Sequence, residues 1–330
     1  MKAPTMNMIK RVAVLLSAVL LATFANGLAA QPAYPDRAVT MVVPFTAGSG
    51  SDIIARIVGP RLAERWRQPV VVDNKPGASG NIGAEAVAKA APNGYTLLMA
   101  INTLTMAPNL YKKPPFDPAV DFAPVMKMAV AHFCMVANPA LPANDLAGLV
   151  ALAKSQPGKL NYASPGNGTP HHLAMELLKL QTGTSLTHVP YKGIAGATTD
   201  LVGGQVQVMF GSLHSVLPQV KGGKLKLLGV TGTRSPLAPS VPSFREQGMD
   251  FMDAVDAWYA LLAPARTPPE LIARLHQDVS AVLALPEVRE QLANQGLTLQ
   301  TGSPEQLDAL LRSDLARWRK VISEAKIVAD

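Results

Sequence analysis

The segment from Pro44 to Asp52, PFTAGSGSD, joins a strand-like run to a helix-like run and is the first candidate for chemistry. Gly48 and Gly50 allow a tight turn that lets a ligand approach the backbone N–H groups, and Ser49 can cap the following helix. Such a loop at the positive end of a helix dipole can hold an anion. An ordinary capped turn explains the same residues equally well. The segment is not a Walker loop, because no Gly-Lys-Ser/Thr follows it.

A second segment of this kind runs from Ser164 to His172, SPGNGTPHH, and also ends a strand-like run before a helix-like one. Ser164, Asn167 and Thr169 supply hydroxyl and amide groups beside the free N–H groups of a helix start, which suits a carboxylate. A helix with an ordinary cap is the alternative. Because neither segment offers an arginine, we expect neutral donors and not a bidentate guanidinium clamp.

The histidines and the cysteine do not form a metal or catalytic set. His171 and His172 are adjacent, so on a helix they point about 100° apart and cannot chelate one metal ion; we expect one of them to pack under the loop and hydrogen-bond to it. Cys134 lies in an apolar run and is expected to be a core thiol. No serine has glycine two residues before and two after it, and no His-Glu-x-x-His occurs. We therefore expect no metal, no cofactor and no catalysis; an exported enzyme that uses the same loops is the alternative.

Both segments belong to series of alternating strands and helices. Apolar runs at 38–44, 69–73 and 95–101 predict buried strands separated by helices, which favours a parallel sheet covered on both faces. Further strands are predicted near 130–137 and at 159–164, 186–190, 206–211, 225–231 and 257–263. Amphipathic helices are predicted at 268–284, 286–295 and 304–325. Open α/β sheets bind ligands where strands run into helices, so the two segments lie where a site is expected.

The first thirty residues have the pattern of a secretory signal peptide. Lys2, Lys10 and Arg11 precede an uncharged apolar run at 12–25, and small residues follow it. That run is shorter than the roughly 20 residues of a membrane-spanning helix, so an anchor is the less favoured interpretation and export to the periplasm is expected. The net charge of +7 includes these three cations, and aromatic residues make up 5% of the chain, so nucleic-acid binding is not expected.

Longer stretches of the sequence resemble a known family. They are VVPFTAGSGSD at 42–52, VVVDNKPGASGNIGAEAVAKAAPNGYTLL at 70–98, DFAPV at 121–125, LNYASPGNGTPHHLAMELLK at 160–179, HVPYKG at 188–193, DLVGGQVQVMF at 200–210 and WYALLAPARTP at 258–268. These strings are similar to the periplasmic solute-binding receptors of tripartite tricarboxylate transporters, often called Bug receptors.

The resemblance implies an α/β, two-lobed periplasmic-binding-protein (Venus flytrap) fold, each lobe a mostly parallel sheet flanked by helices. The chain would cross between the lobes near residues 132 and 257. Lobe 1 would then comprise residues 34–131 and 258–330, and lobe 2 residues 132–257, with the signal peptide at 1–30 and the ligand cleft between the lobes.

The resemblance also implies which residues bind the ligand. Relatives hold a small carboxylate between the two loops, partly through backbone N–H groups. By position, the binding residues are Phe45, Thr46, Ala47, Gly48, Ser49, Gly50 and Asp52 in the first loop and Ser164, Gly166, Asn167, Gly168 and Thr169 in the second. Further candidates are Asn102, Thr103, Tyr191, Gly211, Ser212 and Asp256.

Two positions matter for the choice of ligand. Ser49 stands where relatives commonly carry glycine, so the ligand is either smaller there or accepts a hydroxyl group. Asp256 would place a negative charge near the cleft if it points inward, where it would receive a ligand ammonium or repel a second carboxylate. A position facing solvent is the alternative for Asp256.

The function implied by the resemblance is capture without chemistry. A monomeric receptor would close its lobes on an organic acid, amino acid or aromatic acid and deliver it to a two-component membrane permease. Use of the receptor in sensing, without a dedicated permease, is the alternative. Which carboxylate is bound stays open at this level.

Overall fold

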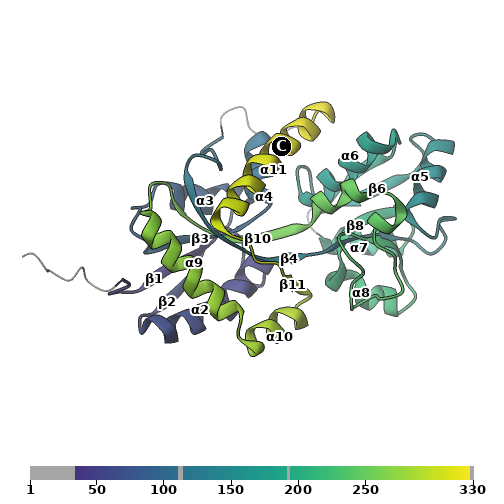
Figure 1. Cartoon of the computed structure of the whole chain (residues 1–330). Helices are drawn as coiled ribbons and strands as arrows, with labels where there is room; N and C mark the ends of the chain where they lie inside the picture. Colours follow the sequence, from purple (N-terminus) through teal and green to yellow (C-terminus); the bar gives the residue numbers. More distant parts are fainter. Residues whose placement is uncertain (1–33, 111–113, 192–193, 328–330) are drawn as a thin grey trace, which may run out of the picture. The chain divides into compact units, whose positions relative to one another are not determined.

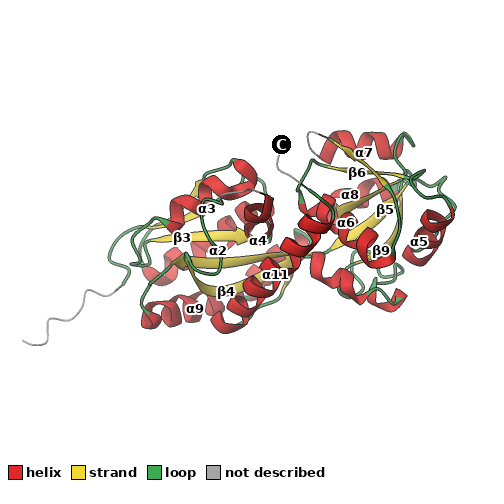
Figure 2. Ribbon diagram, turned by 90° about the horizontal axis from the view of Figure 1, so that it is seen from above, coloured by secondary structure: helices red, strands yellow, loops and turns green. Residues whose placement is uncertain are grey.

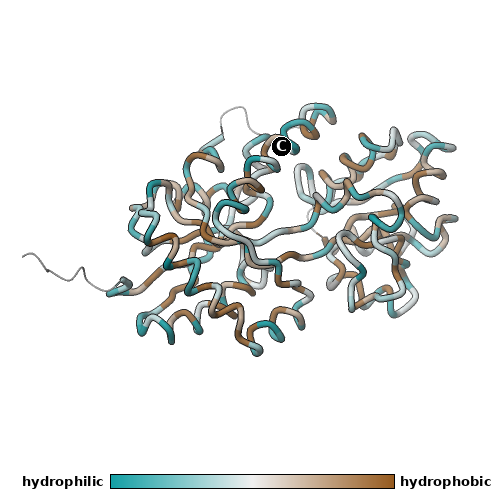
Figure 3. The backbone as a smooth tube through the Cα atoms, viewed as in Figure 1, coloured by the Kyte–Doolittle hydropathy of each residue, from teal (hydrophilic) through white to brown (hydrophobic). Residues whose placement is uncertain are grey.

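The computed structural model describes residues 34–110, 114–191 and 194–327, so the predicted signal peptide lies outside the described residues. From Ala38 onward, the described residues belong to one unit that contains two β-sheets, each flanked by helices (Figure 1). Apolar residues gather along the strands, and polar residues on the outer parts of the helices (Figure 3). This distribution is what two sheets buried between helices require.

The first sheet has six strands in the order β11-β4-β10-β3-β1-β2. They are β1 Val39–Val43, β2 Val70–Asn74, β3 Thr96–Ile101, β4 Phe122–Ala131, β10 Ala257–Pro264 and β11 Leu297–Leu299. β1 pairs in parallel with β2 and β3, as the apolar runs predicted. β10 is antiparallel to β3 and β4, and β11 is antiparallel to β4. The sheet is therefore mixed, because the strands that connect to the second sheet run against their neighbours.

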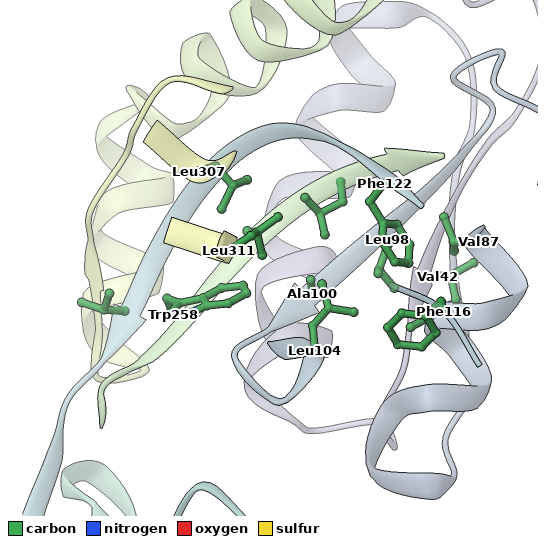
Figure 4. Packing of buried hydrophobic residues seen from close by; sticks show 14 residues of the cluster. Val42, Val87, Leu98, Ala100, Leu104, Phe116, Phe122, Trp258, Leu307 and Leu311 are labelled. Carbon is green, nitrogen blue, oxygen red and sulfur yellow. The ribbon is translucent and has the colours of Figure 1, made fainter. Parts of the chain in front are cut away.

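Helices cover both faces of the first sheet (Figure 2). One group packs together on one face: α2 Gly50–Trp66, α9 Pro269–Leu283 and α10 Pro286–Asn294. The other face carries α3 Asn81–Ala88, α4 Thr103–Met106 and α11 Pro304–Glu324, with the 3-10 turns η1 Ala78–Gly80 and η2 Ala107–Leu110 nearby in the chain. Under the second group lies a core cluster in which Leu98 and Trp258 from the sheet pack with Leu311 from α11 (Figure 4).

The second sheet has five strands in the order β7-β6-β8-β5-β9. They are β5 Phe133–Ala137, β6 Asn161–Ser164, β7 Thr187–Pro190, β8 Val208–Ser212 and β9 Lys226–Val230. β6 is parallel to β7 and β8, while β5 is antiparallel to β8 and β9. The associated helices are α5 Leu146–Ser155, α6 Pro170–Thr182, α7 Ile194–Val202 and α8 Leu213–Lys221, followed by the 3-10 turns η3 Arg245–Gln247 and η4 Asp250–Val255.

The chain passes between the sheets at two points. His132 separates β4 from β5, and Asp256 directly precedes β10. The single strand predicted near 130–137 is therefore two strands in different sheets. The earlier part of β4 was missed because Pro124 and Lys127 interrupt its apolar pattern; the proline is tolerated next to a register shift in the pairing of β4 with β10. The residue limits of the two lobes stay a prediction.

Candidate ligand-binding site

The first loop lies between the end of β1 and the start of α2. Ser49 is the N-cap of α2, and its Oγ accepts a hydrogen bond from the N–H of Asp52 at 3.4 Å. Gly48 adopts φ +83°, in the left-handed region that favours glycine. Among the described residues, none accepts a hydrogen bond from the backbone N–H of Gly50 or Ser51. These donors belong to the first turn of a 17-residue helix, where the dipole favours an anion.

Asp52 holds the first loop in shape. Its carboxylate accepts from the Gly48 N–H at 2.9 Å, the Asn74 amide at 2.9 Å and Arg56 Nε at 3.0 Å, and Asn74 also donates to the carbonyl of Phe45 at 3.0 Å. Burial raises the pKa of Asp52, but the hydrogen bonds from Arg56, Gly48 and Asn74 outweigh it, so the pKa lies below its ordinary value. The carboxylate is thus committed to the loop, while Thr46, Ala47 and Gly48 at its tip are exposed.

Replacing Asp52 by asparagine tests this role. Asp52→Asn removes the charge that Arg56 neutralises and places a buried amide N–H group where its neighbours are also donors. We therefore expect the free energy of unfolding to fall by about 1–3 kcal/mol. The lowered pKa means that the native carboxylate stabilises the fold above its unfolded pKa and loses this effect as the pH falls. Asp308→Asn, in the exposed Arg312–Asp308 pair, is the control and should cost less than about 1 kcal/mol. Equal losses in a urea titration of the two variants would contradict the assignment.

The second loop joins β6 to α6 and is fixed by its own backbone and side chains. Thr169 is the N-cap of α6 and donates through Oγ1 to the carbonyl of Gly166 at 2.8 Å. The N–H of Gly168 donates to His172 Nδ1 at 3.0 Å. His172 therefore packs under the loop and bonds to it, as predicted for one of the two adjacent histidines. Asn167 at the tip of the loop is exposed.

A stack of rings supports the second loop from the side of β6 and β7. Ser164 Oγ is 2.7 Å from His188 Nε2, and the His188 ring stacks on the His172 ring with centroids 3.9 Å apart. The Tyr162 ring also stacks on His188, with centroids 4.8 Å apart, and its hydroxyl donates to Glu176. The pairing of β6 with β7 brings His188 beside Ser164, a proximity between residues 24 positions apart that local sequence pattern does not show.

The remaining candidates lie at strand ends with different degrees of access. Asn102 follows β3, is 1% exposed and donates from Nδ2 to the carbonyl of Asp256 at 3.2 Å; Thr103 starts α4. Tyr191 donates its hydroxyl to Asp200 at 2.7 Å, and burial together with this carboxylate raises the pKa of Tyr191 to about 12. Gly211 lies inside the second sheet opposite Cys134, and Ser212 precedes α8.

Asp256 joins the two crossings. Its carboxylate lies 2.9 Å from His132 Nδ1, accepts from the N–H of Phe133 at 3.4 Å and binds the hydroxyl of Thr231. Its side chain is 14% exposed. Burial lowers the pKa of His132, but the hydrogen bond and charge of Asp256 raise it by more, so the pKa lies above its ordinary value. Sequence reasoning missed this partner, since the two residues are 124 positions apart.

Neither loop lines the larger cavities of the described chain. One cavity of about 660 Å³ and another of about 760 Å³ share His132 in their walls, and only Asp256 among the predicted site residues lines one of them. A site made from two separate loops need not enclose a cavity within either half. In the described residues, no group of histidine, cysteine and acidic side chains has the arrangement of a metal site. Burial raises the pKa of Cys134, which fits the predicted core thiol.

Comparison with known proteins gives one consistent result. Residues 54–327 match the family described as the tripartite tricarboxylate transporter family receptor. Protein BugT of Bordetella pertussis is 34% identical over 322 residues, covering 97% of this chain and 98% of BugT. A structure from R. palustris with adipate is 34% identical, with a TM-score of 0.75, and the match covers 89% of this chain and 99% of that one.

A further structure, MatC from Rhodopseudomonas palustris with bound malate, is 32% identical with a TM-score of 0.72, covering 88% of this chain and 100% of MatC. These matches confirm the α/β periplasmic-binding-protein fold. They also confirm the prediction of a receptor and not an enzyme, because the family is one of solute-binding receptors. No helix in the described residues has the length and apolar character to span a membrane. The chain belongs to the tripartite tricarboxylate transporter receptor family, and it is a solute-binding receptor of the Bug type.

Proposed function

We propose that this receptor captures a small carboxylate in the periplasm and delivers it to a two-component membrane permease. The observation that carries the proposal is the start of α2, where the N–H groups of Gly50 and Ser51 have no acceptor among the described residues and the loop in front is fixed by Asp52. The second loop lies at the corresponding strand-to-helix turn before α6, with Asn167 exposed at its tip. Relatives solved with adipate and malate support the ligand class.

The proposed site comprises the two loops, with binding completed as the lobes close and the crossings at His132 and Asp256 bend. A ligand that prefers the closed form shifts the equilibrium toward it. Export through a signal peptide at 1–30 and action as a monomer complete the proposal. Because the donors at both helix starts are neutral, one carboxylate would gain hydrogen bonds without needing an arginine.

A melting experiment tests the proposed function. The protein, exported and purified from the periplasm, is heated with small monocarboxylates, dicarboxylates, aromatic acids and amino acids in turn. A true ligand at 100 times its dissociation constant stabilises the folded form by about 2.7 kcal/mol, so the melting temperature should rise by several degrees for one chemical class. If every acid leaves the melting curve unchanged, and mass spectrometry of the denatured protein finds no bound acid, the proposal is wrong.

A further inference from the structure

Tyr259 is a mostly buried residue whose hydroxyl group has no hydrogen-bond partner in the part of the chain that the structure describes. It lies on β10 opposite Ile101 of β3 and is 6% exposed. Among the described residues, none donates to its hydroxyl or accepts from it, and burial alone raises the pKa of Tyr259 to about 12. Two other tyrosines, the buried Tyr162 and the half-buried Tyr191, each donate a hydrogen bond to a carboxylate. Tyr259 is thus a mostly buried side chain whose hydroxyl oxygen keeps contact with solvent, and a ligand could take the place of that solvent.

The Tyr259 hydroxyl points at the first residue of α2. A Cβ atom placed on Gly50 would lie 2.2 Å from Tyr259 Oη and 2.7 Å from its ring carbon Cζ. The glycine therefore leaves room for the phenol to reach the helix start. The same turn carries the N–H groups of Gly50 and Ser51, which also have no acceptor among the described residues.

The Tyr259 hydroxyl and the N–H groups of Gly50 and Ser51 can all donate hydrogen bonds. Tyr259 stays protonated at neutral pH, and the helix N–H groups and dipole favour negative charge. Asp52 is the acidic side chain in the first turn of α2, and its oxygens are occupied by Gly48, Asn74 and Arg56. The Tyr259 oxygen can also accept, but no hydrogen bond joins it to these N–H groups among the described residues, and an acceptor-only group such as a carboxylate oxygen would satisfy the hydroxyl and the N–H groups together.

We infer that Tyr259 is a specificity-determining residue whose phenol donates a hydrogen bond to the ligand carboxylate held at the start of α2. The inference rests on the proposed function, since it assigns a residue to the same site. It adds a contact from β10, a strand far from both loops in the sequence and outside the residues predicted to bind. A neutral analogue such as a primary amide offers one acceptor oxygen in place of two and would bind less well.

The test compares two tyrosine-to-phenylalanine variants of the full receptor with the wild type. Adipate, malate and acetate serve as probes in calorimetric titrations, and melting curves are recorded without them. Tyr259→Phe removes an oxygen that has no partner in the protein, so the ligand-free melting temperature should stay unchanged while probe affinity falls about 10- to 100-fold, as expected for a hydrogen bond to a charged group. Tyr95→Phe is the matched control: Tyr95 directly precedes β3, at the end of the strand opposite Asn102, so the change should leave probe affinity within about twofold.

The outcomes separate the inference from the proposed function. If the wild type binds a probe and Tyr259→Phe binds it equally well, the inference is overturned and the proposed function stands. A loss of affinity that accompanies an equal loss of ligand-free stability also overturns the inference, because it assigns Tyr259 a structural role. If the wild type binds none of the three probes, the inference is overturned, and the wider panel of acids in the melting experiment decides the proposed function.

Discussion

Replacing Gly50 by alanine should abolish carboxylate binding and destabilise the receptor. The new Cβ would lie 2.2 Å from the hydroxyl oxygen of Tyr259. Tyr259 is held on a strand in the interior of the sheet, so its ring has little freedom to move away. Overpacking of this kind typically costs about 1–3 kcal/mol, and we expect about 2 kcal/mol here. The shifted helix start would also move the N–H groups of the proposed site.

The measurement is a pair of denaturant titrations, with and without a carboxylate that stabilises the wild type. Gly203→Ala is the matched control, because the nearest atom to its Cβ would be 3.5 Å away and its backbone is not left-handed. The control should keep both the stability and the ligand-induced gain. A Gly50→Ala variant that retained both would show that the space at the start of α2 is not needed, which the account does not allow.

Replacing Asp256 by alanine should be the other large effect. The change removes the carboxylate partner of His132 at the junction of the two sheets, and Thr231 and the N–H of Phe133 each lose one acceptor but keep their hydrogen bonds to each other. Breaking a mostly buried pair in this way costs about 3 kcal/mol, and the looser crossing should also weaken ligand binding. Glu85→Ala, in the exposed Lys89–Glu85 pair, is the control and should cost less than about 1 kcal/mol.

The stabilising effect of the His132–Asp256 pair should depend on pH in a definite direction. The folded pKa of His132 lies above 6.5, so the pair stabilises the fold fully below about pH 6.5 and loses this effect as the pH rises through the folded pKa. Asp253 adds to the rise in pKa and Lys127 opposes it. The difference in unfolding free energy between the wild type and Asp256→Asn should therefore be larger near pH 6 than near pH 8.5. A difference that grew with rising pH would contradict the ion pair.

Sequence reasoning predicted the local parts of this structure well. The glycines and hydroxyl residues of the two loops mark strand-to-helix turns, and Ser49 and Thr169 cap α2 and α6 as their types suggest. The adjacent histidines gave a testable prediction, and His172 bonds to Gly168. These features depend on residues a few positions apart, whose relative geometry is set by the helix itself.

The missed features depend on pairing between distant segments. Tyr259 meets Gly50 because β10 inserts between β3 and β4, an order that local pattern does not specify. His132 meets Asp256 for the same reason. β11 was missed because it has three residues, too few for a periodic signal. The break between β4 and β5 was hidden in a run that is apolar on both sides of His132.

The central claim is that neutral donors at the two helix starts hold a carboxylate and return it unchanged. The most direct test is calorimetric titration of the ligand-free receptor with an acid that raises its melting temperature, and with the carboxamide of that acid. The account predicts one site per chain, binding of the acid at least tenfold tighter than that of the amide, and recovery of the intact acid after denaturation. Equal binding of acid and amide, or recovery of a converted product, would contradict it.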